Sequence, residues 1–320
     1  MASAEVGDDG FGDDPTVAAL EARYAELVGK PSAVLVPSGV MANQIALRVL
    51  TRPGDAVVAG RDQPGVSFEM GAAARNSSIQ FATVDDSNGR LAVEDVLAVI
   101  NAEAHHRPHV SLVVAENTHM PSGGTPWDVA DLRALASAIG ELPLYLDGAR
   151  LFNAVVATGT PAEEYAAPAT LVMSCLTKGL GAPVGSLLAG PPDLIGAARV
   201  ERKRMGGAMH QAGILAAAGL VALDTMIDRL ADDHSRARAL AELFASTFPE
   251  AGYDPRSCRT NIVAFNHPAA RVIVDRLIEF GVLGDTIAAN RARFVTHVDI
   301  TDDDIAYVGE VLEKLRADLG

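Results

Sequence analysis

Short apolar segments alternate with helical patterns along most of the chain, and this alternation limits the possible fold more than any other feature. Strands that alternate with helices predict a mostly parallel sheet with helices on both faces, because each return to a parallel strand needs a crossover. The predicted strands cover residues 33–36, 56–59, 79–84, 111–115, 142–146, 171–173 and 184–189. The predicted fold class is therefore α/β with a large sheet domain.

The pattern changes after an Ala- and Leu-rich stretch at 214–248, which predicts one or two long helices. Beyond it, strands at 261–265 and 293–296 are each followed by a helical pattern, which predicts a smaller C-terminal α+β domain. Earlier helices are predicted at 14–28, 40–50, 93–104 and 129–139. The expected division is an N-terminal segment at 1–14, a large domain at 15–230 and a small domain at 231–320.

The net charge of the chain indicates which classes of binding partner are unfavourable. The formal net charge is −15, which disfavours nucleic acid and anionic membrane surfaces. Cys175 and Cys258 are too few for a disulfide framework, so we expect a reduced, cytoplasmic protein. No secretory signal or membrane span is apparent. A small molecule is the expected partner.

Two candidate sites lie where predicted strands end, which is where open parallel sheets bind ligands. Ser38 and Gly39 separate a strand from a helix, where free N–H groups favour an anion, although an ordinary N-cap serine is the preferred interpretation of this turn alone. Asp147 ends a buried strand, and a carboxylate there needs a cation. That cation is either a protonated pyridine nitrogen or the guanidinium of Arg150.

Lys178 is the most distinctive single residue. It lies in an almost uncharged stretch at 171–192, and lysine is rarely buried. Burial favours the neutral amine, which a lysine that forms a Schiff base requires. A lysine that extends from a Gly-rich loop to the surface is the alternative.

Two further side chains are candidates for contact with a substrate. His119 follows a strand and could act as a general base or stack on a ring, although a lone histidine is more often structural. Arg293 begins a strand of the small domain and could hold a carboxylate with two hydrogen bonds; a surface arginine is the alternative. The histidines at 105, 106 and 109 have polar surroundings, and we predict no metal site there.

The order of these features resembles the low-specificity L-threonine aldolases of the β-eliminating lyase family, which are fold type I enzymes that use pyridoxal 5′-phosphate (PLP). The matching stretches are VGDDGFGDDPTV (6–17), PSGVMANQ (37–44), ENTH (116–119) with 123–124, LDGARLFN (146–153), KGLGAPVGS (178–186) and QAG (211–213). They cover nearly the whole chain.

The resemblance implies a role for each matching residue. Lys178 would carry PLP as a Schiff base, Asp147 would pair with the pyridine nitrogen, and Arg150 would lie near the phenolic oxygen of the cofactor. The phosphate would bind at Ser38, Gly39 and the amide of Val40.

The same resemblance implies the substrate contacts. Arg293, together with Arg150, would bind the substrate carboxylate, and His119 would take the hydroxyl proton. A homodimer or homotetramer is implied, in which the 202–207 stretch would reach the cofactor of the partner.

The implied activity is the cleavage of a β-hydroxy-α-amino acid of the threonine type to glycine and an aldehyde. One alternative is β-elimination from serine or cysteine derivatives. The other is a paralogue that keeps the fold or the cofactor without turnover. The products distinguish the first two, because elimination gives a 2-oxo acid and ammonia.

Four departures from the family pattern bear on activity. An N-terminal segment with a substrate-binding serine has no counterpart, which suggests either a wrongly assigned start or a truncation. Pro64 stands where a histidine normally stacks on the ring, Val40 replaces a threonine of the phosphate turn, and His210 replaces an arginine. These changes leave Lys178 and Asp147 in place.

Overall fold

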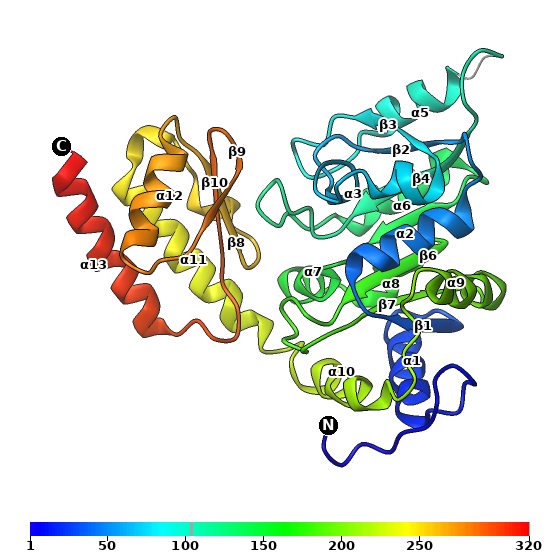
Figure 1. Cartoon of the computed structure of the whole chain (residues 1–320). Helices are drawn as coiled ribbons and strands as arrows, with labels where there is room; N and C mark the ends of the chain where they lie inside the picture. The colour runs from blue at the N-terminus through cyan, green and yellow to red at the C-terminus, as the bar shows by residue number, and fades with distance from the viewer. Residues whose placement is uncertain (103–104, 320) are drawn as a thin grey trace.

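The computed structural model describes residues 1–102 and 105–319, which form two lobes (Figure 1). The large lobe contains a seven-stranded sheet of order β1-β7-β6-β5-β4-β2-β3, and only β7 runs antiparallel to its neighbours within the described strands. The predicted mostly parallel sheet is therefore confirmed. The strands are β1 (Ser32–Val36), β2 (Ala56–Gly60), β3 (Gln80–Val84), β4 (Val110–Glu116), β5 (Leu144–Asp147), β6 (Leu171–Cys175) and β7 (Ser186–Gly190).

Helices cover both faces of this sheet, which explains why most strands are continuous apolar runs. One face packs against α1 (Pro15–Leu27), α5 (Val93–Asn101), α6 (Val129–Ile139), α7 (Leu151–Thr158), α8 (Ala162–Ala166) and α10 (Gly213–Thr225). The other face packs against α2 (Gly39–Leu50), α3 (Pro64–Ser67), α4 (Ala72–Ser77) and α9 (Pro192–Arg204). Among the described residues, no helix is both long and apolar enough to cross a bilayer.

The small lobe has its own sheet and core. Phe244, Phe265 and Phe294 meet at its centre, with ring centroids 4.6–4.9 Å apart. Its elements are α11 (Leu230–Thr247), the short 3₁₀ helices Pro249–Ala251 and Pro255–Ser257, β8 (Ile262–Asn266), α12 (Ala270–Glu279), β9 (Asp285–Ala288), β10 (Arg291–Val295) and α13 (Asp302–Leu319). The predicted α+β character is confirmed.

The stretch at 214–248 forms two helices, α10 and α11, in agreement with the prediction of one or two. Two other elements differ from the predictions. The helix predicted to end at residue 104 ends at Asn101, with residues 103–104 outside the described part. Strand β9 was not predicted, because its residues are polar or half-exposed at the edge of the small sheet. The division at residue 230 stays a prediction.

The two lobes contact one another beside the carboxyl ends of the large sheet. Thr260 donates a hydrogen bond from Oγ1 to the backbone oxygen of Gly124 at 2.8 Å. Asn153 of α7 donates from Nδ2 to Oδ1 of Asn261 at 3.2 Å. These contacts hold β8 and β10 next to the loops that follow β4 and β5.

Candidate active site

The candidate lysine and aspartate lie at the same edge of the large sheet. Asp147 is the last residue of β5 and is paired with Met173 of the parallel strand β6. Lys178 follows β6 by three residues, in the turn before β7. The expected burial of Lys178 is wrong: the turn leaves its side chain exposed, so it lies in an open site and not in an apolar pocket.

Asp147 is almost fully buried and accepts two hydrogen bonds. Its Oδ2 accepts from Asn43 Nδ2 at 2.9 Å, and its Oδ1 accepts from the backbone N–H of Ala149 at 3.0 Å. No ion pair joins Asp147 to Arg150 in the described chain, so the simple pairing suggested by the sequence is absent. A buried carboxylate that is held only by N–H groups remains suited to a cationic partner.

A network that the sequence analysis missed holds this carboxylate. Asn43 Nδ2 also donates to Glu69 Oε1 at 2.7 Å, and Asn43 Oδ1 accepts from the hydroxyl of Tyr145 at 2.6 Å. Gln44 Nε2 donates to Glu69 Oε2 at 2.7 Å. Burial raises the pKa of Glu69 to about 7, and the nearby charge of Asp147 contributes in the same direction. One amide group therefore joins two buried carboxylates.

The turn between β1 and α2 brings backbone close to the sheet. Ser38 caps α2, with Oγ accepting from the N–H of Met41 at 3.2 Å. A Cβ on Gly39 would lie 2.7 Å from Cys175 Sγ, so only glycine fits between α2 and β6. Because α2 begins at Gly39, the backbone N–H groups of Gly39 and Val40 belong to its first turn and have no acceptor within the helix. Val40 itself is about half exposed.

Two arginines from different lobes approach one another without carboxylate partners in the described chain. Arg150 precedes α7, and Arg293 lies on β10, where its Nη1 contacts Met120 Sδ at 3.1 Å. The Nε atoms of both side chains are hidden and have no hydrogen-bond partner among the residues that the structure describes. Burial lowers the pKa of Arg150, and the positive charge of Arg293 lowers it further. Two such guanidinium groups have the charge and the donors to bind an anion.

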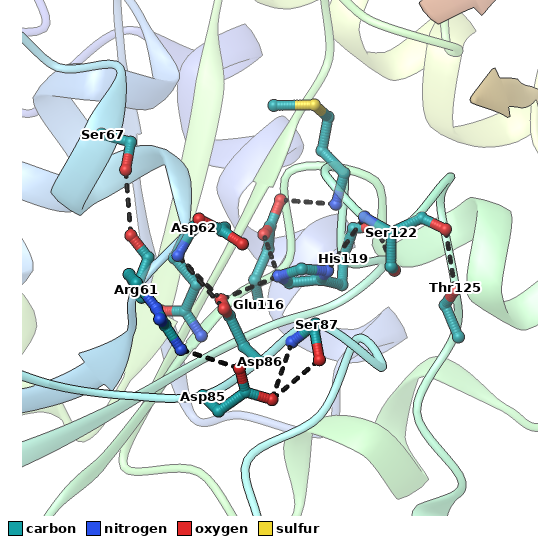
Figure 2. Close-up of polar contacts among 12 residues, drawn as sticks. Arg61, Asp62, Ser67, Asp85, Asp86, Ser87, Glu116, His119, Ser122 and Thr125 are labelled. Carbon is teal, nitrogen blue, oxygen red and sulfur yellow. Dashed lines mark hydrogen bonds and ion pairs between the residues drawn. The ribbon is translucent and has the colours of Figure 1, made fainter. Parts of the chain in front are cut away.

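His119 lies in a buried polar cluster (Figure 2). Its Nδ1 accepts from the N–H of Ser122 at 3.2 Å, and its Nε2 is 3.0 Å from Asp86 Oδ2. Because Nδ1 is an acceptor, Nε2 carries the proton that Asp86 accepts. Glu116 Oε2 lies 3.8 Å from the same Nε2 and has no hydrogen-bond partner, and burial raises the pKa of Glu116 to about 7.

The basic stretch at the end of α9 is divided: Lys203 and Arg204 are exposed, whereas Arg202 is buried. Arg202 is 4% exposed and pairs with Asp9 at 2.6 Å, while its Nη1 donates to Leu35 O at 2.8 Å. The residue faces inward because the acidic N-terminal segment supplies its partner. His210 contacts Asp8 of the same segment at 2.7 Å, and this hydrogen bond lowers the pKa of Asp8.

The position of the expected stacking histidine adjoins Asp147. Gln63, Gly65 and Val66, around Pro64, line a small cavity together with Asp147 and Tyr145. Gln63 is buried and donates from Nε2 to Val114 O at 3.3 Å.

The fold is that of the type I PLP enzymes, with a lysine and an aspartate at neighbouring strand ends and two arginines from different lobes beside them. The β-eliminating lyase family model matches residues 1–267, and the chain belongs to that family.

Similar proteins agree with this assignment. The chain is 38% identical over 317 residues to the low-specificity L-threonine aldolase of Escherichia coli K12, covering 96% of this chain and 91% of the relative. A structure of a candidate L-allo-threonine aldolase from Listeria monocytogenes is 25% identical, with a TM-score of 0.78 over 98% of this chain and 90% of that chain. Serine palmitoyltransferase from S. paucimobilis, solved with PLP and myriocin bound, shares the fold at 16% identity and TM-score 0.74, over 98% of this chain and 80% of that chain.

The residues that the sequence analysis missed carried weak local signals. Glu116 and Asp86 are acidic residues at or just after strand ends, as Asp147 is, and could have been found by that rule. Asn43 and Glu69 gave no such signal, because they are 26 residues apart and meet only in the folded chain.

Proposed function

We propose that this protein is a PLP-dependent lyase that cleaves a β-hydroxy-α-amino acid of the threonine type to glycine and an aldehyde. The observation that carries the proposal is the pair of arginines, Arg150 and Arg293, whose hidden Nε atoms have no partner beside the strand ends that hold Asp147 and Lys178. A carboxylate of the substrate would satisfy both guanidinium groups.

The residues present fit the cofactor. The amine of Lys178 is exposed and free to bind its aldehyde, and the Asp147 carboxylate is available to a protonated ring nitrogen. Ser38, Gly39 and the amide of Val40 would hold the phosphate at the start of α2. When bound, PLP supplies a cationic ring that withdraws the electron pair of the broken Cα–Cβ bond.

We further propose that His119 receives the proton of the substrate hydroxyl. Asp86 fixes the ring through Nε2, so Nδ1 is the atom that accepts, and the Ser122 N–H must then move away from it. The Asp86 carboxylate stabilises the resulting cation in this buried position.

The products of the reconstituted enzyme test the proposal. Purified protein is loaded with PLP and incubated with L-threonine and L-allo-threonine, and glycine, acetaldehyde, 2-oxobutanoate and ammonia are measured. We expect glycine and acetaldehyde in equal amounts. The Lys178→Ala variant should lose the visible absorbance of the bound lysine adduct together with turnover.

Two other results would contradict the proposal. A 2-oxo acid with ammonia and no glycine would assign β-elimination. Cofactor binding through Lys178 without any product would assign a paralogue that has lost turnover.

A homo-oligomer in the cytoplasm is also proposed. Phe11 is 86% exposed and Met70 is 98% exposed, and large apolar side chains at this exposure favour a protein interface. Both cysteines are buried and free, in keeping with a reducing compartment. Native mass spectrometry would give the number of subunits.

A further inference from the structure

A cavity of about 200 Å³ lies against His119, on the side where the two lobes meet. Its large-lobe wall comes from the segment around α3 and from the loops after β3 and β4, and its small-lobe wall comes from β9 and β10. Its lining includes Asp62, Phe68, His119, Pro121, Ile287 and Arg291. Figure 2 shows Asp62, Ser67, Ser87, His119 and Ser122 around this region. The methyl group of threonine would leave most of the cavity empty.

Arg291 and Arg293 point to the same side of the small sheet. They are two residues apart on β10, and alternate residues of a strand share a face. The intervening Ala292, like Phe294, is buried in the core of the small lobe, so the arginine face turns toward the large lobe. Arg291 therefore lies one step beyond the proposed carboxylate site of Arg293.

Only some of the N–H groups of the Arg291 guanidinium have hydrogen-bond acceptors among the described residues. Its Nη1 donates to Asn266 Oδ1 at 3.0 Å, but its Nε is hidden and has no hydrogen-bond partner in the described part of the chain. Burial lowers the pKa of Arg291, and no carboxylate of the described residues forms an ion pair with it. A carboxylate in the cavity could accept two hydrogen bonds from this group.

The acidic groups around the cavity do not already neutralise Arg291. Asp62 is exposed at the rim and attracts it weakly, without an ion pair within the described chain. Asp86 is bound to His119 and to the N–H of Asp62. Arg61, on the neighbouring loop, pairs with Asp85 at 2.7 Å. Arg291 is thus the cation that an anionic substituent would meet.

We propose that this cavity binds the Cβ substituent of the substrate, and that Arg291 selects substituents ending in a carboxylate. The inference rests on the proposed aldol activity and names its substrate class: β-hydroxy-α-amino acids with an acidic side chain. Cleavage breaks the Cα–Cβ bond, the hydroxyl carbon becomes an aldehyde that retains the acid group, and the hydroxyl proton is balanced by a proton gained at Cα of glycine. No oxidant or reductant takes part.

The reverse reaction offers the sharpest test. The PLP-loaded enzyme is given glycine with 4-oxobutanoate, pentanal or acetaldehyde, and kcat/KM is measured for each aldehyde. We expect 4-oxobutanoate to exceed pentanal, which has a similar length and no charge, by about 10-fold or more. Arg291→Met should reduce kcat/KM for 4-oxobutanoate by about 10- to 100-fold and change that for acetaldehyde by less than about 3-fold.

A matched variant on the opposite wall of the cavity should raise, and not lower, kcat/KM for the acidic aldehyde. Asp62→Asn removes the competing negative charge and should raise kcat/KM for 4-oxobutanoate by about 2- to 5-fold, without raising that for pentanal. Arg291→Lys keeps the positive charge and should retain part of the preference, which separates recognition from a folding defect.

The possible failures are distinguishable. Equal rates with 4-oxobutanoate and pentanal, or equal losses for all aldehydes in Arg291→Met, would overturn the inference and leave the aldol activity standing. No reaction of glycine with any aldehyde, acetaldehyde included, would overturn the proposed function and the inference with it.

Discussion

Glu116 is one of two buried carboxyl groups beside His119, together with Asp86. It is 3% exposed, its Oε1 accepts from the N–H of Met120 at 3.1 Å, and burial raises its pKa to about 7, although the neighbouring His119 acts in the opposite direction. The folded chain therefore holds this proton more tightly than the unfolded chain does. Stability from this group is fully present below the ordinary pKa of a glutamate and is lost as the pH rises toward 7.

The corresponding prediction concerns Glu116→Gln. An amide stays neutral, so the variant should be more stable than the parent at pH 8, by an amount on the order of 3 kcal/mol, and nearly equal to it at pH 4.5. Urea unfolding at both pH values measures the difference. Glu141→Gln, at an exposed position, is the control. A constant difference at both pH values would contradict the assignment.

At the scale of elements, the contact between α2 and β6 determines where the phosphate turn lies. A Cβ at Gly39 would lie 2.7 Å from Cys175 Sγ and 3.3 Å from Met173 Cε, and both side chains are buried. The first turn of α2 can therefore approach the sheet only with glycine at its start.

We predict that Gly39→Ala lowers the free energy of unfolding by about 1–3 kcal/mol and weakens cofactor binding, because α2 must move away from β6. Cys175→Ala removes the sulfur that causes the clash. The double variant should be less destabilised than the two single losses added together. Thermal unfolding and cofactor titration measure both effects. Strict additivity would mean that Cys175 does not set the position of the turn.

The sequence predicted elements best where the physical signal was local. The strands of the large sheet are short apolar runs because helices cover both faces of the sheet. Such a run identifies β2 and β4 in the sequence even when the neighbouring strands are unknown. β9 is an exposed edge strand and lacks that signal.

The candidate site was predictable to a similar extent. Ser38, Asp147 and Lys178 stand beside strand ends, a position visible in the sequence. The exposure of Lys178, the inward turn of Arg202 and the bridge made by Asn43 depend on residues far away in the chain, so no spacing rule reveals them.

At the scale of the whole molecule, Gly124 determines how closely the lobes approach. Its φ is +75°, and a Cβ there would lie 2.2 Å from Thr260 Oγ1 and 3.3 Å from Ile262 Cβ in the small lobe. Any side chain at this position would push β8 and β10 away from the loop after β4.

Gly124→Ala should therefore separate Arg293 from Arg150 and reduce kcat/KM for the amino acid by about 10- to 100-fold, with the larger effect on KM. Gly54→Ala is the matched control: its φ is +94°, but a Cβ there would meet nothing within 4 Å. Steady-state kinetics of both variants give the comparison. An equal loss of kcat/KM in the two variants would show that backbone strain, and not separation of the lobes, causes the effect.

The placement of Arg150 and Arg293 on opposite lobes has a consequence for the free protein. Two like charges that face one another across a boundary repel, so the amino acid would act as the counter-ion that draws the halves together. The affinity for the substrate and the closure of the two lobes would then depend on the same interaction. A substitution that weakens the contacts between the lobes, even far from the reacting atoms, would first lower the affinity for the substrate.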